Sequence, residues 1–492
     1  MFKMKNMLFK YKMLPLEIKV AIYFLGCSFL EKGISIFTTP IFTRIMTAEE
    51  YGEFNIFSSW QNILSIFISL NLYGGVYSRG LVKNEKKRSE YSSTLQGLSF
   101  SIILIWGILI FILKEKISNL LGIPQLQLFM LLLIIWTNSC FGLWSGKKRI
   151  ESKYKELIII TLLAIVLKPL LGVILILNLT NKVDARILSI VIVNIFLYSG
   201  LFLIQLREGK KFFSKKYWVD ALKLNIPLIP HYLATSILSV SDRIMIGRLE
   251  GDDKAGIYSL AYSISMILLI FNSVVFQTLE PWLYLRLKEN KVDQFHKIMY
   301  PALIGMGILS IFIIGFAPEI IIFFAPIEYY EAIWTIPPVT MSVFFMFSYT
   351  FFAVFEFYYE KTKYIVLSTF FAATLNILLN YIGITKFGYV IAGYITLFCY
   401  MIYSGMHFFF MRRICKDYMN GEKVYDTKIL LKITIIFIIL SIIILLTYKN
   451  YILRYFILLI LTIYIIINLE KIKRYILELI HIKNYKKEKE NE

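Results

Sequence analysis

Long apolar runs recur along nearly the whole chain, and short polar connections separate them. A helix that rises about 1.5 Å per residue needs about 20 mainly apolar residues to cross a hydrocarbon core about 30 Å thick. Such a helix bonds all of its backbone groups internally, as lipid requires. Fourteen runs are long enough, and they lie near residues 18–43, 54–78, 93–113, 125–145, 157–178, 187–206, 222–246, 256–279, 298–324, 332–356, 364–385, 388–411, 429–447 and 451–469.

The composition agrees with a chain that mostly contacts lipid. Hydrophobic residues make up 58% of the 492 residues and charged residues 17%, whereas soluble domains are usually about 45–50% apolar. We therefore predict an all-α polytopic membrane protein with about 14 transmembrane helices. The four cysteines lack the paired spacing of a zinc site or a disulfide framework. Nucleotide-binding, metalloprotease and nucleophile-elbow motifs are missing from the sequence, so we expect no cofactor and no metal.

The first apolar run follows basic residues, as a signal peptide would. It is too long for one, it contains Glu31 and Lys32, and it has no small residues at the spacing of a cleavage site. We therefore expect it to remain in the protein as the first membrane helix.

The connections between the runs alternate in charge. Lys and Arg outnumber Asp and Glu by 53 to 33, and cytoplasmic loops carry the excess of basic residues in membrane proteins. The pattern predicts an even number of spans with both termini in the cytoplasm, and membrane lipids rather than nucleic acid as partners. The basic connections lie within residues 3–19, 79–88, 147–155, 210–216 and 412–416 and in the tail from 471, and the acidic or neutral ones at 47–53, 251–253 and 328–331.

No connection is long enough for a folded domain outside the membrane. Membrane enzymes that transfer or join sugars usually carry their chemistry on such a domain. We therefore predict a transporter rather than an enzyme.

The chain contains a weak internal repeat with an offset of 204 residues. At this offset Arg44 aligns with Arg248 and Gly52 with Gly256, as expected for a transporter built from two bundles in the same orientation. We predict five parts: an N-terminal six-helix bundle at 15–206, a cytoplasmic linker at 207–221, a C-terminal six-helix bundle at 222–411, two additional helices at 429–469 and a cytoplasmic tail at 470–492.

Several ionisable residues lie inside the predicted spans: Glu31, Lys32, Lys168, Asp242, Arg243 and Glu356. Each costs about 2.5–3.5 kcal/mol near the middle of a bilayer, so several of them together require a wet cavity or a partner. Local pairing that serves packing alone is the alternative to a functional role.

The signs of these charges favour an anionic cargo. We predict Arg44, Lys168, Arg243 and Arg248 as substrate-binding residues, because guanidinium and ammonium groups make charge-assisted hydrogen bonds to the oxygens of a diphosphate. Glu31 and Asp242 are predicted to bind a coupling ion, either a proton or sodium.

Motifs in the middle of the chain point to a family. They are Ile226-Pro-Leu-Ile-Pro-His231, Ser241-Asp-Arg-Ile-Met-Ile-Gly247, Ala255-Gly-Ile-Tyr-Ser-Leu-Ala-Tyr262, Glu280-Pro-Trp282 and Asn376-Ile-Leu-Leu-Asn-Tyr-Ile-Gly383, with Glu50-Tyr-Gly-Glu-Phe54 in the first half. Together they resemble the polysaccharide biosynthesis flippases, the Wzx-like O-antigen transporters of the multidrug, oligosaccharidyl-lipid and polysaccharide (MOP) exporter superfamily. Ile391-Ala-Gly393 stands where the family usually has Gly-Ala.

The resemblance implies a MATE-like V-shaped pair of six-helix bundles in the bacterial inner membrane. It also implies export of undecaprenyl-diphosphate-linked oligosaccharide repeat units for O-antigen or capsule synthesis, with a polysaccharide polymerase as a candidate partner. The sugar, the coupling ion and the oligomeric state do not follow from the sequence.

Two other functions stay open. A multidrug or cation antiporter of the same superfamily would share the fold, although a cavity for cationic drugs should be acidic. A membrane glycosyltransferase would need acidic catalytic residues, for which Glu49 and Glu50 in the first external connection are candidates.

Overall fold

The computed structural model describes Gly26, Leu30 and residues 33–34, 36–151, 153–289, 291–468 and 470. These residues are mostly helical, and no strand occurs among them, so the all-α prediction is confirmed. Residues 36–45 are helical. The later helices are α3 (Ala48–Ser69), α4 (Gly75–Lys83), η1 (Glu85–Lys87), α5 (Arg88–Ile112), α6 (Lys114–Leu121), α7 (Gln125–Ile150), α8 (Tyr154–Asn178), α9 (Lys182–Gly209), α10 (Lys215–Asn225), η2 (Ile226–Leu228), α11 (Ile229–Glu250), α12 (Asp252–Ser265), α13 (Leu268–Lys288), η3 (Val292–Gln294), α14 (Phe295–Gly315), α15 (Ala317–Phe324), η4 (Ile327–Trp334), α16 (Ile336–Tyr358), α17 (Thr362–Phe387), α18 (Ile391–Tyr418), α19 (Thr427–Leu446) and α20 (Tyr451–Ile467).

Within the described residues, ten helical segments are long and apolar enough to cross a membrane, and α20 is a shorter apolar helix. From the second span onward, each of the predicted spans coincides with one or more helices of the structure. The first span lies mainly outside the described residues. The protein is therefore a multi-pass helical membrane protein.

Two of the predicted acidic connections are in fact the first turns of helices. Thr47 caps α3: its hydroxyl accepts from the Glu50 N–H, and the Glu50 carboxylate accepts from the Thr47 N–H. This capping box satisfies backbone groups that a helix start leaves unbonded. Gly251 is the equivalent cap of α12, 204 residues later, so the repeat has the same register in both halves. Helices α6 and α15, both eight residues long, also occupy equivalent places.

The chain forms two compact units, residues 1–240 and 241–492. Helix α11 begins in the first unit and ends in the second. We expected a linker at 207–221, where the structure has the end of α9, a short connection and most of α10. The bounds of the two six-helix halves stay a prediction.

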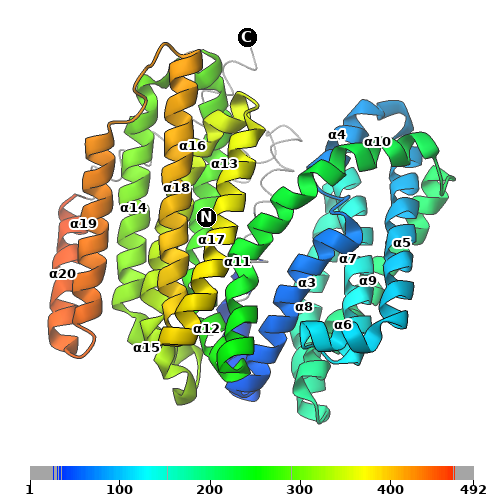
Figure 1. Cartoon of the computed structure of the whole chain (residues 1–492), viewed down its shortest axis with the longest axis horizontal. Helices are drawn as coiled ribbons and strands as arrows, with labels where there is room; N and C mark the ends of the chain where they lie inside the picture. The colour runs from blue at the N-terminus through cyan, green and yellow to red at the C-terminus, as the bar shows by residue number, and fades with distance from the viewer. Residues whose placement is uncertain are drawn as a thin grey trace, which may run out of the picture. The chain divides into compact units, whose positions relative to one another are not determined.

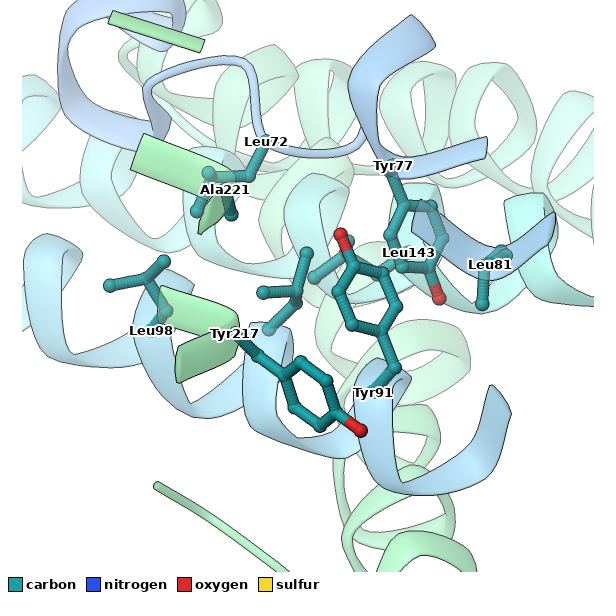
Figure 2. Close-up of a cluster of buried hydrophobic side chains, with 9 residues drawn as sticks. Leu72, Tyr77, Leu81, Tyr91, Leu98, Leu143, Tyr217 and Ala221 are labelled. Atoms are coloured by element: carbon teal, nitrogen blue, oxygen red, sulfur yellow. The ribbon is translucent and has the colours of Figure 1, made fainter. Parts of the chain in front are cut away.

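In unit 1, α5, α7, α8 and α9 pack together, and α10 lies against α4 and α5 (Figure 1). Figure 2 shows the buried cluster beneath α10, where Tyr217 meets Tyr91 edge to face with ring centroids 5.3 Å apart. The Tyr77 hydroxyl is 2.7 Å from the Ser92 hydroxyl, which donates to Gln205 at 2.5 Å. These bonds satisfy the buried Tyr77 hydroxyl, as burial in an apolar interior requires. The cluster consists of Leu72, Tyr77, Leu81, Tyr91, Leu95, Leu98, Leu143, Tyr217 and Ala221.

Close backbone contact fixes the connection that leads into α10. A Cβ added at Gly97 on α5 would overlap the backbone carbonyl oxygen of Phe212, which is not the end of a flexible side chain. We therefore expect Gly97→Ala to lower the free energy of unfolding by about 1–3 kcal/mol, the usual cost of overpacking. Thermal unfolding of the purified protein in detergent measures this. Gly200→Ala on α9 is the matched control, because a Cβ there meets nothing within 4 Å; an equal loss in both variants would contradict the explanation.

In unit 2, α16 is the central helix and contacts α12, α13, α14, α17, α18 and α19. Helices α19 and α20 lie at one edge of the unit, with α19 packed along α14 (Figure 1). Arg454 of α20 is 2% exposed and forms an ion pair with Glu319 of α15, which also accepts from the Tyr455 hydroxyl at 2.7 Å. The two additional helices are therefore joined to the rest of unit 2 by a half-buried charge pair as well as by apolar contacts.

Candidate functional site

A cavity of about 300 Å³ lies inside unit 1. It extends along one face of α8, because Leu157, Thr161, Ala164 and Lys168 recur at helical spacing. Residues 157 to 168 span about 16 Å of helix at 1.5 Å per residue. The described residues that line it are Ile34, Thr38, Phe42, Phe54, Phe141, Arg149, Leu157, Thr161, Ala164, Ile165, Lys168, Pro169, Arg186, Ser189, Ile190 and Tyr198.

The described part of the lining is positively charged. Among the residues just named, Arg149, Lys168 and Arg186 are basic and none is acidic. Three cations around an apolar cavity create a local field that attracts anions and disfavours cations. The cavity therefore suits a ligand that combines negative charge with apolar or sugar groups.

Aromatic rings hold two of these cations. The Arg186 guanidinium carbon lies 3.6 Å from the ring centroid of Phe54 and 3.9 Å from that of Phe42. The Lys168 ammonium lies 5.3 Å from the ring centroid of Tyr198. Cation–π contacts of this kind stabilise a charge within an apolar wall. Arg186 is thus oriented before any ligand arrives.

The four predicted substrate-binding residues are distributed over both units. Lys168 lines the cavity of unit 1. Arg44 is exposed and donates to the carbonyl of Pro40 at 2.9 Å. Arg243, which belongs to unit 2, lies 4.2 Å from the ring centroid of Tyr262, and Arg248 is exposed near the end of α11. Only Lys168 of the four is a lining residue of the cavity as described, and the roles of all four stay predictions.

Asp242 is the centre of a buried polar network in unit 2 and is 1% exposed. Its carboxylate accepts from the hydroxyls of Tyr258 and Thr396, both at 2.6 Å, and from the amide of Asn380 at 2.7 Å. The partners come from α12, α18 and α17, so one carboxylate joins four helices. Asn380 Oδ1 is buried and has no hydrogen-bond partner among the described residues, which leaves an oxygen beside the carboxylate that could still coordinate a cation. Glu31, the other predicted ion-coupling residue, lies outside the described residues.

Arg149 and Arg186 were missed by the sequence reasoning. Both were assigned to connections, because the predicted spans ended at 145 and began at 187. Helix α7 continues to Ile150 and α9 begins at Lys182, capped by Asn181, so each arginine lies within a helix end. The Asn181 cap, whose side chain accepts from the Asp184 N–H at 2.9 Å, was the signal that could have extended the helix back over Arg186.

Comparison with solved structures identifies the fold. A structure titled lipid II flippase MurJ, inward closed conformation, matches with a TM-score of 0.63 at 14% identity, covering 89% of this chain and all of that one. An inward-facing multidrug resistance MATE family transporter of the MOP superfamily matches with a TM-score of 0.55 at 15% identity, covering 81% of this chain and 95% of that one. A MOP superfamily transporter from Pyrococcus furiosus, whose title reports reverse polarity of its binding pocket, matches with a TM-score of 0.54 at 14% identity. The match covers 82% of this chain and 96% of that one. The fold is that of the MOP superfamily, as predicted.

Residues 18–284, more than half of the chain, match the model of the polysaccharide biosynthesis protein family. The chain belongs to this family, which confirms the resemblance found in the sequence. An uncharacterized membrane protein from Haemophilus influenzae is 23% identical over 370 residues, which cover 71% of this chain and 86% of that protein.

Proposed function

We propose that the protein is a flippase that moves an undecaprenyl-diphosphate-linked oligosaccharide across the bacterial inner membrane for the synthesis of O-antigen or capsule. The cationic lining of the unit 1 cavity is the observation that carries this proposal. Membership of the polysaccharide biosynthesis family and a MurJ-like fold support it.

The diphosphate is the part of this cargo that the cavity suits. Lys168 and Arg186 are held at its wall, and Arg186 presents a planar fork of donors that matches phosphate oxygens. Each hydrogen bond to a charged group contributes about 1.5–3 kcal/mol. The prenyl tail needs no polar site, because it remains in lipid while the head group crosses. In this mechanism Arg44, Arg243 and Arg248 bind the same head group at other stages of the cycle.

Asp242 binds the coupling ion in the proposed mechanism. A carboxylate beside the orphaned Asn380 oxygen offers the oxygen ligands that hard cations prefer, and a proton would neutralise the same buried charge. Glu31 is the second candidate, as the sequence suggested. Both termini lie in the cytoplasm in this proposal, and a polysaccharide polymerase is the partner that would receive the cargo.

Transport by the purified protein tests the proposal. The full chain is reconstituted in liposomes that contain a fluorescent undecaprenyl-diphosphate-linked oligosaccharide. The protein should move the fluorophore to the inner leaflet, where a membrane-impermeant quencher cannot reach it. Empty liposomes and undecaprenyl-linked sugar lacking the diphosphate serve as controls. Fluorophore that stays accessible, together with efflux of organic cations from the same liposomes, would instead support the antiporter. Transfer of a radiolabelled sugar by the isolated protein would support the glycosyltransferase.

A further inference from the structure

A second buried acid–base pair lies in unit 2, apart from Asp242. Glu356 of α16 and His407 of α18 are both 0% exposed, and Glu356 Oε1 is 2.8 Å from His407 Nδ1. The outer atoms of the pair, Glu356 Oε2 and His407 Nε2, are buried and have no hydrogen-bond partner among the described residues. Buried polar atoms are nearly always bonded, so two such atoms in one pair require an explanation.

The pair has two protonation states that differ by one charge. With one proton, held on Nδ1 between the two side chains, the pair carries a charge of −1 and Nε2 is a bare acceptor. A second proton on Nε2 or on Oε2 makes the pair neutral overall. A net charge is costly to bury, whereas the neutral state is compatible with the apolar surroundings. The unpartnered atoms are the two places where that second proton would be held.

Aromatic and hydroxyl groups surround the pair. The Tyr403 ring is 4.5 Å from the His407 ring in an edge arrangement, and the Tyr349 ring is 5.3 Å away. The titratable side chains that contact the His407 ring are Tyr349 of α16 and Tyr403 of α18. On the neighbouring elements, Tyr284 of α13 contacts Tyr358 and Tyr425 contacts Phe352, both on α16. Lys361, before α17, bonds to the Glu356 carbonyl through its backbone N–H. From α14, Phe295 reaches Phe355, and from α17, Thr369 faces Tyr403; neither side chain titrates.

The pair shares one helix face with the Asp242 network. Thr396, Tyr400, Tyr403 and His407 follow each other on α18 at intervals of four, three and four residues, and all four are buried. This spacing places them on one side of the helix. Thr396 bonds to Asp242 at one end of this stripe and His407 to Glu356 at the other, about 16 Å apart along the axis.

Glu356 also lies close to a helix end. It is two residues before α16 finishes at Tyr358, and the connection to α17 follows immediately. If this end of unit 2 opened to water, the charged state would be stabilised, so proton release and opening would be linked.

We propose that Glu356 and His407 form a proton-binding site of unit 2, separate from Asp242 and linked to it along one face of α18. The proposal does not depend on the identity of the cargo. It predicts that unit 2 takes up a proton at this pair even when no lipid-linked sugar is present.

Magnetic resonance of the histidine rings tests the site directly. The chain has four histidines, so ring-¹⁵N-labelled histidine in the full chain, reconstituted in lipid nanodiscs, gives few signals, and the signal lost in His407→Gln is that of His407. We expect the His407 ring signals to change as the pH is lowered, because the pair takes up its second proton, and this change to differ in Glu356→Gln. Should His407→Gln fail to insert, single His231→Gln, His296→Gln and His481→Gln variants assign the signal by elimination.

Glu319→Gln is the matched control, since it removes a carboxylate from a different charge pair of unit 2, the one with Arg454, and should leave the His407 signals unchanged. Infrared spectra give a second measurement. We expect any low-pH band of a protonated carboxylic acid from this pair to be lost in Glu356→Gln and kept in Glu319→Gln. If the His407 signals and the carboxylic acid band are both constant over the pH range, or if the His407 response to pH is the same in Glu356→Gln, the proposal is wrong and the pair is purely structural.

Discussion

Replacing Lys168 and Arg186 by methionine should abolish transport while the protein still folds and inserts. Methionine retains most of the apolar volume of each side chain, so the contacts with Phe42, Phe54 and Tyr198 are largely kept. The positive charge is lost together with its hydrogen bonds and its cation–π attraction. If each contributes about 1.5–3 kcal/mol to binding of the diphosphate, each single variant should weaken cargo binding about 10- to 150-fold, and the double variant should be inactive.

Surface polysaccharide restored in a flippase-deficient strain and the liposome assay both measure this effect. Lys116→Met on the exposed face of α6 is the control, because it removes one charge away from the cavity. Arg186→Lys separates charge from shape: it should recover part of the activity, since lysine keeps the charge but lacks the planar fork. Full transport by the double methionine variant would show that the cavity does not bind the anionic head group.

Much of this fold follows from sequence because membrane insertion imposes one simple rule on every helix. The length and spacing of the apolar runs predicted the helices, and the capped starts of α3 and α12 repeat at the offset seen in the sequence. Breaks inside spans were not predicted. The run at 256–279 divides at residues 266–267 into α12 and α13, and the run at 298–324 divides near Phe316 and Pro318 into α14 and α15, because apolar composition alone does not register a local change of helix direction.

The candidate sites were predicted less completely, for a physical reason. Lys168, Asp242 and Glu356 were identified because each is an ionisable residue inside an apolar run, where a charge is costly and therefore rare. Arg186 and His407 lacked this signal. Arg186 lies in the first turns of α9, where a cation near a membrane edge is ordinary, and neutral histidine carries no charge that marks it. The pairing of His407 with Glu356, 51 residues apart, depends on how α16 packs on α18, which no local pattern encodes.

Substitution of Asp242 is expected to have the second large effect on transport. Its carboxylate accepts from Tyr258, Thr396 and Asn380 within a fully buried network. Asp242→Ala would leave these donors buried without an acceptor at about 1–3 kcal/mol each, so that variant should be poorly folded and says little about transport. Asp242→Asn keeps the size of the side chain and one acceptor oxygen, and it removes the charge that would bind a proton or a sodium ion.

We therefore expect Asp242→Asn to fold, to bind cargo and to lose the dependence of transport on an ion gradient. One charge moving through 100 mV supplies about 2.3 kcal/mol, equivalent to about fifty-fold in the ratio of cargo between the two leaflets, and this gain should vanish in the variant. Transport in liposomes with an imposed proton or sodium gradient measures this gain. The gradient that increases transport by the native protein identifies the coupling ion. Ser241→Ala is the matched control, because it changes the neighbouring side chain, whose hydroxyl donates to Asn376 at 3.1 Å, and leaves the carboxylate in place. If Asp242→Asn still responded to the gradient as the native protein does, the coupling ion would have to bind elsewhere in the chain, and the Glu356–His407 pair would become the first site to test.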